Sequence, residues 1–417
     1  MLTALGSLSF YALISYLYSS AVLGFVSFLM SMLIPIGAIT RAGRDSAVLA
    51  QITHRGIEWE KARTHLRQQF VQVLPLSLVG ACAFTIISTL NPNAGQVGYS
   101  VWHAALASGS IIFLNISYLM SFFFRAFGHT VQSCLQETGA LFLISSMIVA
   151  FMAFVFDAHK MLSVSLAILV GSMLAAAYGA LVLNARDRGN SATSNTESTP
   201  FDSGREFDRM RRSFAWSTAA SVVQANSVMF VSGFFLTPAD LGILAASVAL
   251  SGALSFFLIV INIVAPRALA PAVQCMDVAQ INEVCGKLSA QALALSTPLF
   301  AIALAFPALL GQALGVDFGV HKLPFFVILF SQFINVVTGP AGLLLKVTAN
   351  HNILLTVSLY TTLLVLPAAL YFVPVFGVTA AALAYLILSL SNNLSYAFFI
   401  KKELGFWLRP RVALAHR

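Results

Sequence analysis

The sequence predicts an all-α polytopic membrane protein, and two observations support that prediction. The first is composition: of the 417 residues, 59% are hydrophobic and only 9% are charged, with a mean hydropathy of +0.86. Soluble globular proteins carry roughly 25% charged residues, so this chain cannot cover a surface that faces water. The second is spacing, because long uncharged stretches recur, and the one between Arg67 and Arg125 runs for 57 residues.

About eleven apolar segments are each long enough to form a membrane-spanning helix, which needs about 20 apolar residues. Short apolar cores of soluble proteins imitate one such segment but not eleven in series. The first segment is also long enough to hide a second helix. The predicted helices cover residues 8–34, 69–91, 101–124, 135–156, 161–184, 214–236, 241–265, 289–310, 323–346, 354–373 and 377–400.

The basic residues are distributed unevenly between alternate loops. Cytoplasmic loops of multi-pass membrane proteins collect Lys and Arg. Of the 23 basic residues, 21 follow odd-numbered predicted helices, and only Lys160 and Lys322 follow even-numbered ones. This distribution predicts a cytoplasmic C-terminus and, with eleven helices, an N-terminus on the outer side.

The longest polar interruption, residues 185–213, is rich in Ser and Thr and ends in a basic cluster, as is typical of a linker. It separates two similar stretches, "LNISYLMSFFFRAFGHT" (114–130) and "INVVTGPAGLLLKVTANH" (334–351). Weak internal repeats of this kind are typical of transporter folds, and they predict two pseudo-symmetric half-bundles. The predicted organisation is a five-helix half-bundle (1–184), a cytoplasmic linker (185–213), a six-helix half-bundle (214–402) and a cytoplasmic tail (403–417).

Motifs for catalysis or cofactor binding are not evident. The sequence offers no catalytic triad, paired carboxylates, phosphate-binding loop or zinc-ligand spacing, and its four cysteines are scattered. We therefore expect a protein that is not an enzyme, with no metal, no cofactor and free thiols. The loops assigned to the outer side are all short, which argues against a membrane polymerase or ligase acting on extracytoplasmic sugars.

Three segments carry a family resemblance: "ADLGILAASVALSGALSFFLIVINIVAPRALAP" (239–271), "INVVTGPAGLLLKVTANH" (334–351) and "VPVFGVTAAALAYLI" (373–387). In order and spacing they resemble the multidrug/oligosaccharidyl-lipid/polysaccharide exporter superfamily, and most closely its O-antigen and polysaccharide repeat-unit flippases of the Wzx type. The resemblance covers roughly residues 5–130 and 214–405. Such proteins usually have twelve or more helices, so the resemblance implies a twelve-helix fold that lacks its first helix.

The resemblance implies a flippase of the bacterial inner membrane. It would move undecaprenyl-pyrophosphate-linked oligosaccharide units across that membrane for O-antigen or other surface polysaccharide synthesis, by alternating access. Its partners would be the lipid-linked substrate, membrane lipids, a polysaccharide polymerase and a chain-length regulator, with no nucleic acid. The nearest alternative is a drug or cation antiporter of the same superfamily, which would need buried carboxylates; a membrane polymerase or ligase is the more distant alternative.

Two basic residues and two asparagines recur at matching places in the repeated stretches. Arg125 and Lys346 follow Asn115 and Asn335 by ten and eleven residues, respectively. A rise of about 1.5 Å per residue puts each asparagine about 15 Å deeper, near the middle of the membrane. We hypothesise that the basic pair receives the pyrophosphate at the cytoplasmic mouth and that the asparagines contact sugars. The alternatives are helix anchoring for the basic residues and a helix-to-helix hydrogen bond for the amides.

Five further residues complete the candidate set. Arg267 follows a proline at a place where the resembled family often has a basic residue, although anchoring also accounts for it. Gln224 and Asn226 are polar groups within a predicted helix, and the family often has Asp where this chain has Asn226, which puts a proton-relay role there in doubt. Gly339 and Pro340 interrupt the ninth predicted helix and are interpreted as either a hinge or a static kink.

Overall fold

The computed structural model describes residues 2–55, 57, 59–155, 159–190, 205–258, 260–261, 265, 269, 272–273, 275, 277–348 and 351–407. Of these residues 89% are helical, and none of them forms a strand. Seven of the described helices are long and apolar enough to cross a membrane, and four shorter apolar helices accompany them. The predicted class, an all-α multi-pass membrane protein, is confirmed.

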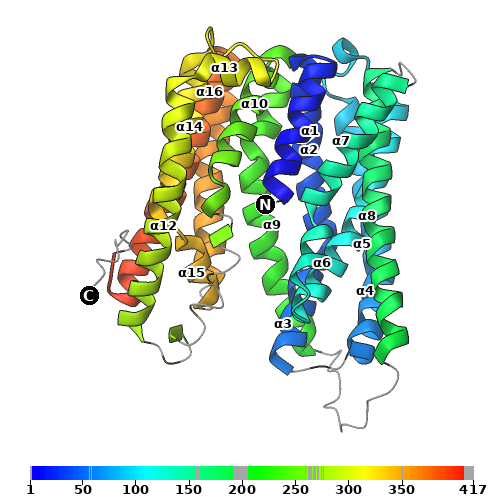
Figure 1. Ribbon diagram of the computed structural model, residues 1–417, viewed down its shortest axis with the longest axis vertical. Helices are drawn as coiled ribbons and strands as arrows, with labels where there is room; N and C mark the ends of the chain where they lie inside the picture. Colours follow the sequence, from blue (N-terminus) through cyan, green and yellow to red (C-terminus); the bar gives the residue numbers. More distant parts are fainter. Residues whose placement is uncertain are drawn as a thin grey trace. The chain divides into compact units, whose positions relative to one another are not determined.

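Figure 1 traces the helices in chain order. They are α1 (Leu2–Leu17), α2 (Ser20–Arg41), α3 (Arg44–Arg55), α4 (Trp59–Thr89), a 3₁₀ turn η1 (Gly95–Val97), α5 (Val101–Ala126), α6 (Thr130–Leu135), α7 (Thr138–Val155), α8 (Lys160–Asn190), α9 (Arg205–Phe235), α10 (Pro238–Leu254), α12 (Val278–Ala305), α13 (Pro307–Ala313), α14 (Lys322–Thr338), α15 (Ala341–Val347) and α16 (His351–Leu404).

The first predicted helix, residues 8–34, is wrong as a single element. It is divided between α1 and α2, which are separated by Tyr18 and Ser19. The Ser19 hydroxyl accepts a hydrogen bond from the Val22 backbone N–H group (3.3 Å), and this bond caps α2. A serine cap breaks a helix without lowering the local hydropathy, so the apolar run conceals the boundary.

Two glycines interrupt the later helices where the sequence suggests a break. Gly339 (φ 64°, ψ −150°) separates α14 from α15, so the predicted interruption of helix 323–346 is confirmed. Gly377 (φ 62°, ψ −144°) breaks α16 between the two helices predicted there. Both conformations lie in a region that side chains disfavour and glycine tolerates. Whether Gly339 and Pro340 act as a hinge stays a prediction.

The residues form two compact units by internal packing. The N-terminal unit comprises Leu2–Tyr18 and Phe28–Val223, and the C-terminal unit comprises Ser19–Ser27 and Gln224–Arg417. In the N-terminal unit, α5 packs against α4 and α8, while α1 packs against α7. In the C-terminal unit, α14 packs against α16, α10 and α12. Helices α2 and α9 each contribute residues to both units.

Helical residues extend into both ends of the predicted linker. Helix α8 continues to Asn190 and α9 begins at Arg205, so both ends of the segment 185–213 are helical. Residues 191–204 lie outside the described residues. The polar ends form helix because they extend hydrophobic helices that are already nucleated, and such extension costs less than starting a new helix.

Candidate functional site

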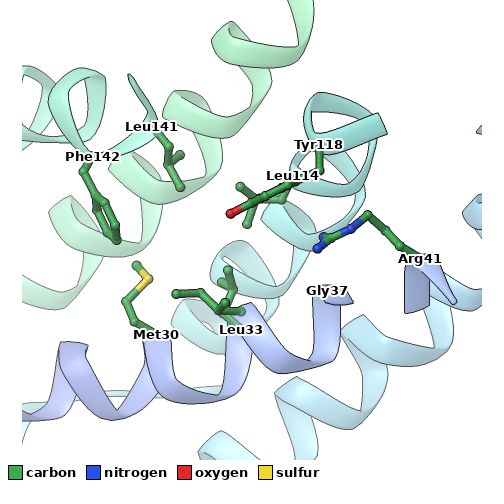
Figure 2. A pocket seen from close by; sticks show the side chains of 9 residues that line it. Met30, Leu33, Gly37, Arg41, Leu114, Tyr118, Leu141 and Phe142 are labelled. Carbon is green, nitrogen blue, oxygen red and sulfur yellow. The ribbon is translucent and has the colours of Figure 1, made fainter. Parts of the chain in front are cut away.

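A pocket lies within the N-terminal unit, with walls from α2, α5 and α7 (Figure 2). Most of its lining is apolar, and the Arg41 guanidinium and the Tyr118 hydroxyl both point toward it (Figure 2). The lining residues are Met30, Leu33, Ile34, Gly37, Arg41, Leu114, Tyr118, Leu141 and Phe142. A cationic group beside apolar walls makes this pocket a candidate binding site.

Arg41 is positioned by the end of α2. Ala42 (φ 49°) and Gly43 (φ 72°) turn the chain there, and α3 begins at Arg44. The turn returns Asp45 to Arg41, whose Nε–H group donates to Asp45 Oδ2 at 2.9 Å. The Arg41 guanidinium also lies over the Tyr118 ring, 4.2 Å from its centroid, which is a favourable cation–π geometry.

Asn115 connects this ion pair to two neighbouring helices. Its side chain is fully buried, and its Oδ1 atom accepts a hydrogen bond from Arg41 Nη1 at 3.0 Å. Its Nδ2 group donates to Thr40 Oγ1 and to Ser77 Oγ, each at 2.8 Å. A Cβ atom at Gly37 would lie 3.3 Å from Asn115 Oδ1, so glycine leaves room for the amide. Asn115 therefore ties α2, α4 and α5 together at Arg41.

The spare N–H donors of Arg41 suit a ligand that accepts hydrogen bonds, although the Arg41–Asp45 pair carries no net charge. Arg41 and Asp45 are both buried, with side chains 7% and 4% exposed. Burying a guanidinium is costly unless it is paired and hydrogen-bonded, and Asp45 and Asn115 supply that compensation. Because a guanidinium carries five N–H donors, Arg41 has donor capacity beyond these two bonds.

Arg41 was not among the residues singled out from the sequence, where it counted only as a basic residue after the first predicted helix. Two signals could have found it. Gly37 and Arg41 are four residues apart, so they share one face of a helix. Arg41 also follows directly on the apolar run, with an acid four residues beyond it.

Arg125 lies at the end of α5, and its charge is paired. Its guanidinium forms an ion pair with Glu137, which follows α6, and its Nε–H group donates to Ser133 Oγ at 3.3 Å. The Arg125 side chain is 42% exposed. The side chain of Lys346 and the whole of Arg267 lie outside the described residues. The basic pair of Arg125 and Lys346 therefore stays a prediction.

Asn335 belongs to a neutral hydrogen-bonded cluster in the C-terminal unit. Its Nδ2 group donates to Gln332 Oε1 at 3.0 Å, and its Oδ1 atom accepts from Ser389 Oγ at 2.9 Å. Asn393 also donates to Asn335 and accepts from Thr338 Oγ1 at 2.9 Å. These hydrogen bonds join α14 to α16, and Asn335 is half-buried.

Gln224 reaches the same region of α16 from α9. Its side-chain amide donates to Thr361 and to Asn392 Oδ1, the latter at 2.9 Å. Gln224 and Asn335 thus both bond to polar side chains of α16 in the C-terminal unit, and we call these uncharged contacts together the neutral seam. Asn226 is half-buried on α9. Asn115 belongs to the Arg41 cluster of the N-terminal unit.

Metal chemistry finds no support in the part of the chain that the structure describes. No group of three or more His, Cys, Asp or Glu side chains there is placed to hold a metal ion. All four cysteines lie in that part, and they are free thiols.

No protein-family model matches the sequence, and no curated protein matches it. Solved structures do match over nearly the whole chain. The MATE multidrug transporter DinF-BH in complex with R6G is 14% identical with a TM-score of 0.70, covering 96% of this chain and 92% of that one. The lipid II flippase MurJ in an inward closed conformation is 12% identical with a TM-score of 0.67, covering 96% and 86%. An inward-facing multidrug resistance MATE transporter of the MOP superfamily is 12% identical with a TM-score of 0.64, covering 97% and 95%. At these identities the likeness shows the fold alone: the chain has a membrane-transporter fold like those of the MATE transporters and MurJ.

Proposed function

We propose that the protein is a transporter that moves an anionic, lipid-linked oligosaccharide across the bacterial inner membrane. The proposed substrate is an undecaprenyl-pyrophosphate-linked repeat unit for O-antigen or another surface polysaccharide, carried by alternating access. In this proposal the C-terminus is cytoplasmic, the protein is not an enzyme, and a polymerase and a chain-length regulator use the product. The likeness to MurJ, a flippase of lipid II, supports a substrate of this class.

The observation that carries the proposal is Arg41 in the pocket of the N-terminal unit. Charged side chains within membrane-spanning segments are costly, and they usually mark a substrate or ion pathway. The planar guanidinium matches two oxygens of a phosphate group, which a lysine ammonium does not. The pocket adds the Tyr118 hydroxyl beside that guanidinium.

The neutral seam of the C-terminal unit supports the carbohydrate part of the proposal. Asn335, Gln332 and Asn392 are half-buried and present amide groups, which donate and accept hydrogen bonds as sugar hydroxyls do. We infer that these amides contact sugars.

A drug antiporter is the second candidate, and the pocket lining favours it on one point. Met30, Tyr118 and Phe142 give thioether and aromatic surfaces that suit a flat organic cation, and two of the similar structures are multidrug transporters. Against this candidate, the nearest carboxylate, Asp45, is already paired with Arg41. A cationic drug would have to compete with that arginine.

The deciding experiment deletes the gene and measures where lipid-linked sugar units accumulate. We expect cytoplasmic-side accumulation, complemented by the wild-type gene, not by Arg41→Gln, and only partly by Arg41→Lys. Lys287→Gln is the matched control, because Lys287 is an exposed basic residue paired with Glu283. Sensitivity to R6G without accumulation of lipid-linked sugars would support the antiporter instead.

A further inference from the structure

A second buried arginine lies beside the turn between α2 and α3. Arg44, the first residue of α3, is 8% exposed, and its Nη1 group makes a long contact of 3.4 Å with the Arg41 backbone carbonyl. Among the described residues, its Nε–H group is buried with no hydrogen-bond partner. A buried, unsatisfied donor on a charged group is expensive, so it indicates a partner that the protein itself does not supply.

The turn brings Arg44 against a second basic residue on α9. Gly43 packs directly on the α9 backbone: a Cβ atom there would lie 2.4 Å from the Arg211 carbonyl oxygen and 2.4 Å from the Ala215 nitrogen. Only glycine permits this approach, and its φ of 72° also suits glycine. The contact fixes Arg44 beside Arg211.

The local charge is not balanced. Burial and the neighbouring Arg211 charge lower the pKa of Arg44, while the Asp208 carboxylate raises it. Asp208 is already bound by Arg211, whose Nε–H group donates to it at 3.2 Å. The other nearby acid, Asp45, is engaged by Arg41 and by the Ser46 backbone N–H group. Among the side chains that the structure describes, two guanidinium groups thus share one carboxylate.

We propose that Arg44 and Arg211 bind a phosphate group at the corner between α2 and α3. Two guanidinium groups from different helices match the oxygens of a phosphate group, and the Arg211 side chain, 21% exposed, leaves one side open. The phosphate belongs either to an anionic phospholipid headgroup or to a soluble phosphate compound. This site is distinct from the pocket, because the Arg41 side chain points into the pocket (Figure 2) whereas neither Arg44 nor Arg211 lines it. It does not depend on the proposed transport function.

The test is the thermal unfolding midpoint of the purified, delipidated protein at constant ionic strength. Inorganic phosphate and phosphatidylglycerol are the two probes, and diacylglycerol, which has the same tails without phosphate, is the lipid control. We expect a rise of about 2 °C or more with at least one probe and none with diacylglycerol. A rise with phosphatidylglycerol alone identifies a lipid headgroup, and a rise with inorganic phosphate identifies a soluble ligand.

Variants make the test specific. Arg44→Gln removes an uncompensated charge, so the variant should fold. Its unfolding midpoint should no longer rise with the probe, and that of Arg44→Lys should rise by less than in the wild type. Arg211→Gln is the second test, in case Arg44→Gln does not fold. Arg212→Gln, an exposed neighbour on α9, should retain the full rise. An equal rise in Arg44→Gln, or no rise with either probe in the wild type, would overturn the proposal.

Discussion

Asn115 and Asn335 occupy matching places in the two repeated stretches, but their surroundings differ in charge and in exposure. Asn115 is fully buried and bonded to Arg41, which is itself paired with Asp45. Asn335 is half-buried among uncharged amides and hydroxyls. The same residue type therefore serves an ionic cluster in the N-terminal unit and a neutral seam in the C-terminal unit. The difference teaches that a sequence repeat can conserve position while the chemistry around it diverges.

The largest expected effect comes from separating the charges of the N-terminal cluster. Asp45→Asn leaves the Arg41 guanidinium buried beside Asn115 without its carboxylate, and breaking a buried pair costs about 3–5 kcal/mol. We expect a matching loss of unfolding free energy in detergent. The double variant Arg41→Gln, Asp45→Asn should recover part of it, since it leaves no buried charge there. Equal stability of Asp45→Asn and the wild type would show that the Asp45 carboxylate does not stabilise the buried Arg41 guanidinium.

The two asparagines themselves provide the direct comparison. Asn115→Ala removes three hydrogen bonds and leaves a buried Arg41 donor unsatisfied, which should cost about 3 kcal/mol. Asn335→Ala should cost only about 1 kcal/mol, because it removes only neutral hydrogen bonds and two of its partners, Gln332 and Ser389, are half-buried. Unfolding of both variants under one condition measures the difference. Equal losses would remove the distinction between an ionic cluster and a neutral seam.

Helix continuity is another contrast, because α5 runs unbroken through Asn115 while α14 ends three residues after Asn335. Gly339→Ala places a Cβ atom 2.1 Å from Ser289 Oγ at a φ of 64°. The strained backbone should lower the unfolding free energy by about 1–3 kcal/mol. The double variant Gly339→Ala, Ser289→Gly removes the clash with Ser289, so it should recover only the part of the lost unfolding free energy that the clash causes. A complete recovery would show that the backbone conformation at residue 339 carries no strain. The unfolding free energies of the single and double variants measure the contribution of the clash and the contribution of the backbone strain.

Local signals in the sequence explain which features were predictable. Long apolar runs predict the membrane helices, and the Gly339–Pro340 pair predicts the break between α14 and α15. The boundary at Ser19 was missed because a serine cap leaves the hydropathy of the run unchanged. Arg41 was missed because a basic residue at a helix end has the same pattern whether it anchors the helix or faces a pocket. The pairing of Arg125 with Glu137 depends on the turn through α6, which no spacing rule predicts.

The smallest stability effect is expected at Arg125, and it separates anchoring from substrate contact. The pair with Glu137 is partly exposed, so Arg125→Gln should change the unfolding free energy by only about 0–1 kcal/mol. If Arg125 receives a pyrophosphate, the anion must displace Glu137. Arg125→Gln should then abolish surface polysaccharide at normal protein level, Arg125→Lys should restore it in part, and Glu137→Gln should keep it.

Lys346→Gln completes the test of the predicted basic pair. If both residues serve one headgroup, the double variant with Arg125→Gln should be no worse than the stronger single variant, because the two losses are not independent. Surface polysaccharide and protein level are measured together in each strain. Normal polysaccharide from well-expressed Arg125→Gln and Lys346→Gln single variants would assign both residues to helix anchoring. Substrate binding would then rest on Arg41, in the pocket of the N-terminal unit.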